Sequence, residues 1–198
     1  IARSSQDQML YPRRGSNFSF GIQLTPPYSV FSKKDYSTLS ADEKYKYIEF
    51  HKWSFKSAWY TSIIGNLVLA TKAEFGYLGH YNKDIGASPF EKFEVGGNPM
   101  YASSYIFGAD IISLRGYKDG SITPKVILEG RSTPINNGNV YNKYTIELRY
   151  PFSLNPSATI YGLAFIEGGN AWQEINEFNP YQIKRSAGIG VRVFLPMF

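Results

Sequence analysis

The clearest pattern in the sequence is an alternation of apolar and polar residues with a period of two. It runs through four segments: 17–24 (NFSFGIQL), 66–81 (NLVLATKAEFGYLGHY), 140–152 (VYNKYTIELRYPF) and 185–195 (RSAGIGVRVFL). Two further segments, 45–60 and 158–169, are rich in apolar and aromatic residues but do not divide cleanly into two faces. Because successive side chains of a β-strand point to opposite faces, the six segments predict about six long strands. No segment keeps a helical period, although 39–47 could form one helical turn within a loop.

The two faces of these strands differ in a way that is typical of a membrane β-barrel. One face carries small and charged residues: Gly21, Lys72, Glu74, Gly76, Gly188, Gly190 and Arg192. The other is apolar, and we expect the following residues to face lipid: Phe18, Phe20, Ile22, Leu24, Leu67, Leu69, Phe75, Tyr77, Ile189, Val191 and Val193. A lipid-facing outer wall and a wet lumen produce this division. The mixed segment 45–60 predicts a β-bulge or a shift of phase near Glu49–His51.

The connections between the predicted strands alternate in length. Residues 153–157 (SLNPS) form a tight turn rich in Asn and Pro, whereas 25–44 and 82–139 are long. Short turns at one end and long loops at the other are typical of an outer-membrane barrel. Long loops in compact domains are usually functional. The length of 82–139, its apolar run Ile106–Ile112 and its glycine pair therefore predict an ordered loop that folds inward.

Composition narrows the function classes. With 43% hydrophobic and 17% aromatic residues the chain is not disordered, and no apolar run approaches the roughly 18 residues of a membrane helix. The absence of cysteine excludes disulfides, thiolate zinc sites and a cysteine nucleophile. The net charge of +5 is dispersed, so no nucleic-acid groove is expected. A soluble carbohydrate-binding β-sandwich with surface aromatics stays open as an alternative.

No constellation in the sequence predicts an enzyme. The only histidines, His51 and His80, have no companions at metal-ligand spacing, so we expect neither a metal nor a cofactor. The glycine pairs of 94–99 and 167–170 do not begin a strand–loop–helix unit that would hold a phosphate. Glu147 and Glu167 could be imagined as a glycosidase pair, but nothing else indicates a sugar cleft.

One cation in the long loop raises a different question. Arg115 lies in LRGY, between Leu114 and the pair Gly116–Tyr117. A guanidinium taken from bulk water needs partners, and its rigid fork of donors suits carboxylates. Glu147 lies on the polar face of its strand, and Glu167 ends the next one. An inward loop could therefore place Arg115 against both, with Gly116 allowing close approach and Tyr117 packing on the inner wall. A solvated loop charge is the alternative.

Several motifs resemble one family in the same order along the chain. LRGY (114–117), preceded by FEVGG (93–97), resembles the sixth-loop signature of the BamA superfamily of outer-membrane assembly and secretion barrels. Four other stretches are similar to further parts of that barrel: 10–20, 24–29, 141–172 and 185–196. The resemblance implies that Arg115 docks on Glu147 and Glu167, the second at a position where many relatives have Asp. Loop glycines Gly96 and Gly97 match too, but the spacing from Gly97 to Arg115 is longer than usual.

This resemblance implies an all-β fold: an antiparallel transmembrane β-barrel. Residues 1–198 would supply about six strands of a sixteen-stranded C-terminal barrel domain. The N-terminal periplasmic repeats, the first strands and the last two strands would lie outside the sequence. Residues 82–139 would be the inward-folded extracellular loop that carries LRGY.

The implied function is to fold and insert β-barrel proteins into the outer membrane of a Gram-negative bacterium. The implied partners are unfolded outer-membrane clients, accessory lipoproteins and outer-membrane lipid, and no nucleotide or cofactor is required. A polypeptide-secretion transporter of the same superfamily is the alternative. The number of periplasmic repeats would separate the two.

Overall fold

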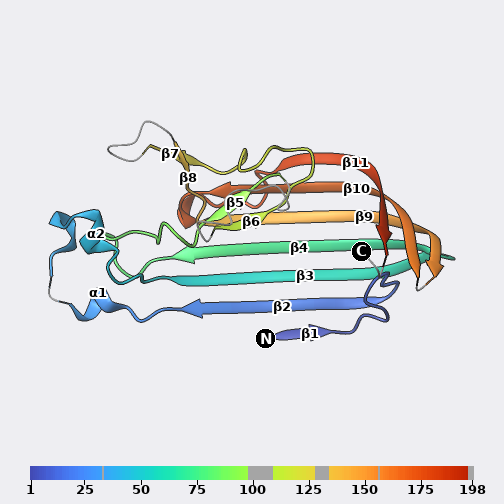
Figure 1. Ribbon diagram of the computed structural model, residues 1–198, viewed down its shortest axis with the longest axis horizontal. Coiled ribbons are helices and arrows are strands. Elements are labelled where there is room, and N and C mark those ends of the chain that lie inside the picture. The colour runs from blue at the N-terminus through green and yellow to red at the C-terminus, as the bar shows by residue number, and fades with distance from the viewer. Residues whose placement is uncertain (33, 98–108, 128–133, 156, 196–198) are drawn as a thin grey trace.

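Six long strands and one short strand form a single antiparallel sheet (Figure 1). The computed structural model describes residues 1–32, 34–97, 109–127, 134–155 and 157–195. The long strands are β2 (Gly15–Leu24), β3 (His51–Ile64), β4 (Leu67–Gly79), β9 (Val140–Asn155), β10 (Ala158–Trp172) and β11 (Lys184–Phe194). The order is β1-β2-β3-β4-β9-β10-β11, where β1 spans only Ala2–Ser4. The predicted long strands are thus confirmed, and the sheet does not close on itself.

Short and long connections lie at opposite ends of this sheet, as the sequence predicts. At one end, the turn end, β3 joins β4 through Gly65 and Asn66. At the same end β9 finishes at Asn155 and β10 begins at Ala158. At the other, the loop end, the β2–β3 connection contains α1 (Tyr28–Phe31), η1 (Tyr36–Thr38) and α2 (Ala41–Lys44). The expected helical turn within 39–47 is therefore confirmed by α2.

The other two loop-end connections also carry short elements. Between β4 and β9 lie β5 (Phe93–Val95), β6 (Asp110–Ile112), β7 (Lys125–Val126) and β8 (Ile135–Asn136). The β10–β11 connection contains η3 (Ile175–Glu177). No helix among the described residues is long and apolar enough to cross a membrane.

The bulge expected near Glu49–His51 is wrong. Strand β3 begins at His51 and pairs without a break until a register shift between Ser62 and Ile64. Glu49 precedes the strand and is buried, where its carboxylate accepts hydrogen bonds from the backbone N (2.8 Å) and the hydroxyl of Ser29. The apparent loss of phase arose because a loop segment, in which Glu49 is buried and Tyr47 and Ile48 are exposed, directly precedes the strand.

The register confirms the assignment of the two faces. All residues expected to face lipid lie on one face of the sheet, and Ile189, Val191 and Leu24 are 88%, 62% and 65% exposed. Phe75 lies on this face too, but its ring packs against Phe178 instead of being free. A continuous exposed apolar face belongs to a membrane barrel and not to a soluble β-sandwich, whose outer face is polar.

The polar face holds the core of the structure in two clusters. Near the turn end, Tyr11 from the β1–β2 connection packs edge-on against Tyr161, with ring centroids 5.1 Å apart. The Tyr11 hydroxyl donates to the carbonyl oxygens of Asn66 (3.2 Å) and Arg149 (3.1 Å). Burial raises the pKa of the Tyr11 phenol, which keeps it protonated as a donor. This tyrosine therefore ties two turns and β9 together.

The second cluster shows that the β4–β9 connection folds onto the polar face. Strand β5 packs on β9 and β10 (Figure 1). The Phe93 ring lies 4.8 Å from that of Tyr141. Ile112 and Val95 are buried beside them. Residues 106–108 of the apolar run lie outside the described residues, as do 128–133. The described parts of this connection occupy the side of the sheet where a barrel has its lumen.

An arginine on the apolar face tests this assignment. Val191→Arg should lower the free energy of unfolding of the full-length protein by about 2–4 kcal/mol, because the guanidinium would sit in hydrocarbon. Denaturant unfolding in lipid vesicles measures the change. Asn17→Arg, on the polar face opposite Ala58, is the control and should change it by less than about 0.5 kcal/mol. Equal losses in both variants would contradict the assignment.

Candidate functional site

The loop that carries Arg115 is held in shape by two glycines. Gly96 (φ +116°) and Gly97 (φ +77°) adopt left-handed backbone conformations, and their N–H groups donate to the carbonyls of Ile112 and Tyr117, each at 3.0 Å. A Cβ on Gly97 would lie 1.7 Å from an Asp119 carboxylate oxygen, so only glycine fits there. Both glycines expected from the sequence therefore pin the 93–97 strand segment to the LRGY segment.

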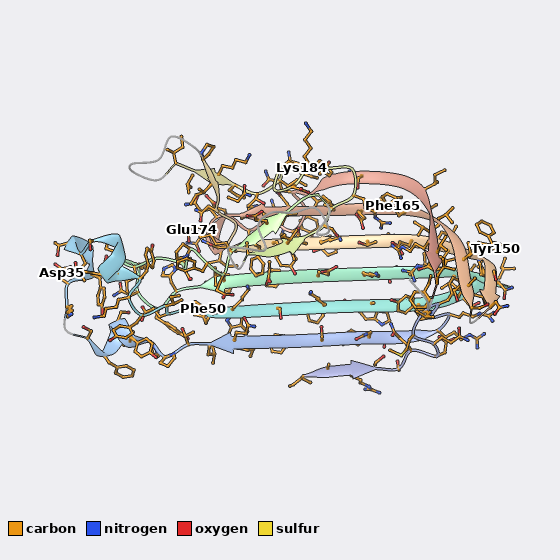
Figure 2. The ribbon with its side chains drawn as sticks, viewed as in Figure 1. Asp35, Phe50, Tyr150, Phe165, Glu174 and Lys184 are labelled. Atoms are coloured by element: carbon orange, nitrogen blue, oxygen red, sulfur yellow. The ribbon has the colours of Figure 1, made fainter. Side chains whose placement is uncertain are left out.

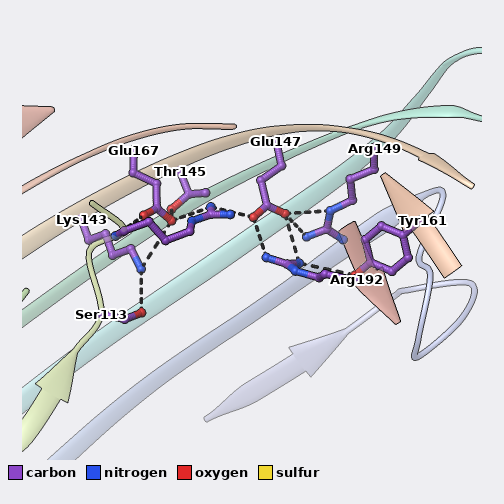
Figure 3. Close-up of polar contacts among 9 residues, drawn as sticks. Ser113, Lys143, Thr145, Glu147, Arg149, Tyr161, Glu167 and Arg192 are labelled. Atoms are coloured by element: carbon purple, nitrogen blue, oxygen red, sulfur yellow. Dashed lines mark hydrogen bonds and ion pairs between the residues drawn. The ribbon is translucent and has the colours of Figure 1, made fainter. Parts of the chain in front are cut away.

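Arg115 contacts both carboxylates. Figure 3 shows Glu147 and Glu167 near each other, each with dashed polar contacts. Arg115 Nη2 donates to Glu147 Oε1 at 2.8 Å and to Glu167 Oε1 at 2.7 Å. Its backbone N–H donates to Glu167 Oε2 at 3.0 Å, and its guanidinium carbon lies 3.6 Å from the centroid of the Phe165 ring. We define Arg115, Glu147, Glu167 and Phe165 as the arginine clasp.

The sheet register explains why the two carboxylates lie together. Glu147 on β9 pairs with Phe165 on β10, and Thr145 pairs with Glu167. The two glutamates therefore lie on the same face of adjacent strands, one diagonal step apart. Both side chains are almost fully buried, at 1% and 4% exposed. Two buried carboxylates at this spacing would repel each other, so a cation between them stabilises both.

The rest of the LRGY motif adds contacts around the clasp. Leu114 is fully buried and bridges to Gly97. Gly116 has φ +84°, a conformation that disfavours other residues. The Tyr117 hydroxyl donates to the backbone carbonyl of Arg185 on β11 at 2.8 Å. The motif therefore touches three consecutive strands, β9, β10 and β11.

Sequence reasoning missed two arginines that share Glu147. Arg149 Nε donates to Glu147 Oε2 at 2.8 Å, and Arg192 Nη2 donates to Oε1 at 2.8 Å. Arg149 lies two residues after Glu147 on the same strand face, a signal that was present in the alternation. Arg192 comes from β11 and reaches across β10, which only the register reveals. Glu147 is thus the centre of an ionic brace from β9 to β11. The contacts with Arg149 and Arg192 do not involve the loop.

Glu167 has a different environment. Thr145 Oγ1 donates to its Oε1 at 3.2 Å, and Lys143 Nζ lies 3.8 Å away, beside Ser113 Oγ at 3.5 Å. Arg115 is its one guanidinium partner among the described residues, and contacts it through both backbone and side chain. Glu167 is therefore the carboxylate whose charge balance depends most on the loop.

This arrangement suits attachment and not catalysis. Both carboxylates are engaged by cations, so neither is free to serve as a general acid or base. Within the described part of the chain, no group of three or more His, Cys, Asp or Glu could hold a metal ion. What the site can do is hold a loop against a wall.

An unclosed antiparallel sheet with an apolar outer face and a loop strapped to its polar face is a part of a membrane β-barrel. The family model described as the Omp85 superfamily domain matches the chain over residues 1–198. The chain therefore belongs to the Omp85 superfamily, whose members insert or secrete proteins at the outer membrane of Gram-negative bacteria. A search of the curated proteins gives no match to the sequence. The turn end accordingly faces the periplasm and the loop end the exterior.

Removal of the clasp cation should release the loop. Arg115→Ala leaves Glu167 without its guanidinium partner, and breaking such a buried arrangement typically costs on the order of 3–5 kcal/mol. In folded full-length protein we expect faster cleavage by a lysine-specific protease at Lys118 and Lys125. Lys83→Ala, an exposed cation of the same connection, is the matched control and should leave cleavage unchanged. Unaltered protection in Arg115→Ala would show that the clasp does not hold the loop.

The two glutamates should respond differently to neutralisation. Glu147→Gln leaves Arg149 and Arg192 without their carboxylate and Arg115 with Glu167 alone, whereas Glu167→Gln leaves all three arginines with Glu147. We therefore expect Glu147→Gln to cost more of the free energy of unfolding, within the range of about 3–5 kcal/mol for a broken buried pair. Denaturant unfolding of both variants compares them. A larger loss for Glu167→Gln would contradict the bracing role of Glu147.

Proposed function

We propose that this chain is part of the barrel of an outer-membrane protein assembly factor, which folds β-barrel proteins and inserts them into the outer membrane. Residues 1–198 would belong to one C-terminal barrel domain, with 82–139 as its inward-folded loop. Unfolded outer-membrane proteins would be the clients, and accessory lipoproteins the partners. The observation that carries this proposal is that the arginine clasp and Tyr117 together join the loop to three consecutive strands.

The clasp gives one side of the barrel wall a rigidity that strand pairing alone does not supply. A client strand must pair with an exposed strand edge, which requires two barrel strands to separate elsewhere in the wall. Separation at one place is useful only if the remaining strands keep their register. The brace from β9 to β11 and the loop across it resist sliding of these strands, because buried charges would lose their partners.

No cofactor is needed for such an activity. The free energy that drives insertion comes from the client itself, which satisfies its backbone hydrogen bonds and buries its apolar face in lipid as the barrel closes. The assembly factor supplies a template edge and a stable wall. Glu147 and Glu167 are paired with Arg115, so they fit a structural role in the wall.

The clasp also gives the experiment that tests this function. Full-length protein in lipid vesicles receives a urea-unfolded client barrel, and folding of the client is followed by its protection from protease. We expect Arg115→Ala to slow client folding and Arg115→Lys to restore part of it, because an ammonium replaces the charge but not the planar stacking on Phe165.

Two controls separate the outcomes. Lys83→Ala should fold the client at the wild-type rate. A secreted passenger, offered in parallel, distinguishes assembly from the polypeptide-secretion alternative of the same superfamily. If wild-type protein translocates the passenger and leaves the client unfolded, the proposed function is wrong. If Arg115→Ala folds the client at the wild-type rate, the clasp has no role in that function.

A further inference from the structure

The connection between β10 and β11, residues 173–183, lies against the outer, apolar face of the sheet. The Phe178 ring packs between Phe75 and Trp172, with centroid distances of 5.4 Å and 5.0 Å. Phe75 is on the outer face because it pairs with Phe55, and Trp172 because it pairs with Val140. This segment, which we call the outer segment, therefore folds back over the wall and does not stand above the barrel.

Beneath the outer segment the wall carries two polar side chains on its lipid side. Asn142 on β9 and Asn170 on β10 are paired with each other in the register and are only 1% and 9% exposed. The outer segment supplies their acceptors: Asn142 Nδ2 donates to the Pro180 carbonyl at 3.4 Å, and Asn170 Nδ2 donates to the Gln182 carbonyl at 2.8 Å. Asn142 Oδ1 in turn accepts from the backbone N–H of Asn170 at 3.2 Å, so the outer segment and the wall together pair these side chains.

The close fit of the outer segment extends to a glycine on the wall. A Cβ at Gly168 would lie 2.8 Å from Cδ1 of Ile183, so the Ile183 side chain rests directly on the β10 backbone. Together with the Phe178 and asparagine contacts, this gives the outer segment a seat on β4, β9 and β10. These contacts indicate that the outer segment is docked in a defined position on the wall.

The outer face of β9 shows at what depth this seat lies. Below Asn142 the outward residues are uniformly apolar or aromatic as far as the register shift in β9: Tyr144, Ile146, Leu148, Tyr150 and Phe152. From Tyr144 to Phe152 the strand extends roughly 26 Å, which a tilt of about 40° reduces to about 20 Å. That covers most of the apolar band of an outer-membrane barrel, which is about 25 Å tall. Asn142 and the outer segment therefore lie just beyond the band, at its extracellular edge.

The side of the outer segment that faces away from the wall is amphipathic. Tyr181 is 87% exposed and Ile175 38%, and the carboxylates of Glu174 and Glu177 are exposed beside them. Figure 2 shows Glu174 at the opposite end of the sheet from Tyr150. Tyrosine with an apolar ring and a polar hydroxyl is enriched at the level of lipid headgroups.

We propose that residues 173–183 form an interfacial collar: a segment that occupies the headgroup layer of the outer leaflet against the outside of the barrel. Its inner side supplies hydrogen-bond acceptors to Asn142 and Asn170, and its Phe178 ring packs between β4 and β10. Its outer side, with Tyr181 and Ile175, contacts lipid headgroups. The barrel wall at β9 and β10 thus meets the outer leaflet through a polypeptide layer, whereas the apolar band below it contacts acyl chains directly.

Spin labelling suits this test because residues 1–198 contain no cysteine, and any cysteine elsewhere in the full-length protein is first replaced by serine. Single cysteines replace Tyr181, Ile189 and Ile127 in the full-length protein reconstituted in lipid vesicles, and each carries a nitroxide. Ile189, 88% exposed on the outer face of β11, is the acyl-chain reference, and Ile127, 70% exposed after β7, is the aqueous reference. We expect the ratio of oxygen to aqueous-relaxant accessibility at 181 to fall between the two. A ratio equal to that at 127 would overturn the collar.

A second variant tests the packing of Phe178 between Phe75 and Trp172. Phe178→Ala should shift the accessibility at 181 toward the aqueous value, because the outer segment loses its hold on Phe75 and Trp172. Phe31→Ala, which removes an 81% exposed phenylalanine from α1, is the matched control and should leave it unchanged. An unchanged ratio in Phe178→Ala would show that this ring does not seat the segment. Neither result depends on client folding, so the collar and the assembly function can fail separately.

Discussion

The buried carboxylate of Glu147 is the interaction on which the rest of the site depends. It receives guanidinium groups from the loop (Arg115), from its own strand (Arg149) and from β11 (Arg192). Such a charge is tolerated only because the desolvation cost is offset by several close cations. Arg115 ties the loop to β9, and Arg192 ties β11 to β9. The same electrostatic requirement therefore aligns the strands and determines where the loop can dock.

The two faces of the sheet solve opposite solvation problems. On the polar face, charges and hydroxyl groups are buried under a loop, so they must be paired with one another. On the apolar face, lipid replaces water, and Asn142 and Asn170 lie at the extracellular edge of the apolar band. There the outer segment supplies the missing acceptors. In both places a connection between strands covers polar groups that the strands themselves leave unsatisfied.

Much of the fold followed from the sequence because strand periodicity is a local property. The alternation in 66–81 and 140–152 assigned Leu69, Lys72 and Glu147 to the correct faces, since direction depends only on position along the strand. The start of β3 was missed because aromatic residues occur both in the loop before His51 and in the strand after it. Composition alone does not distinguish these two environments.

What the sequence by itself determined is which residues lie on each face, where the long loops fall, and that Arg115 carries a charge requiring partners. Only the tertiary structure decided which carboxylates meet it, that Arg192 joins them from β11, and that residues 173–183 fold over the outer wall. The physical reason is that strand register and loop docking depend on pairing between distant segments. A period of two specifies the face of a residue, whereas its neighbours across the sheet are specified only when the strands align.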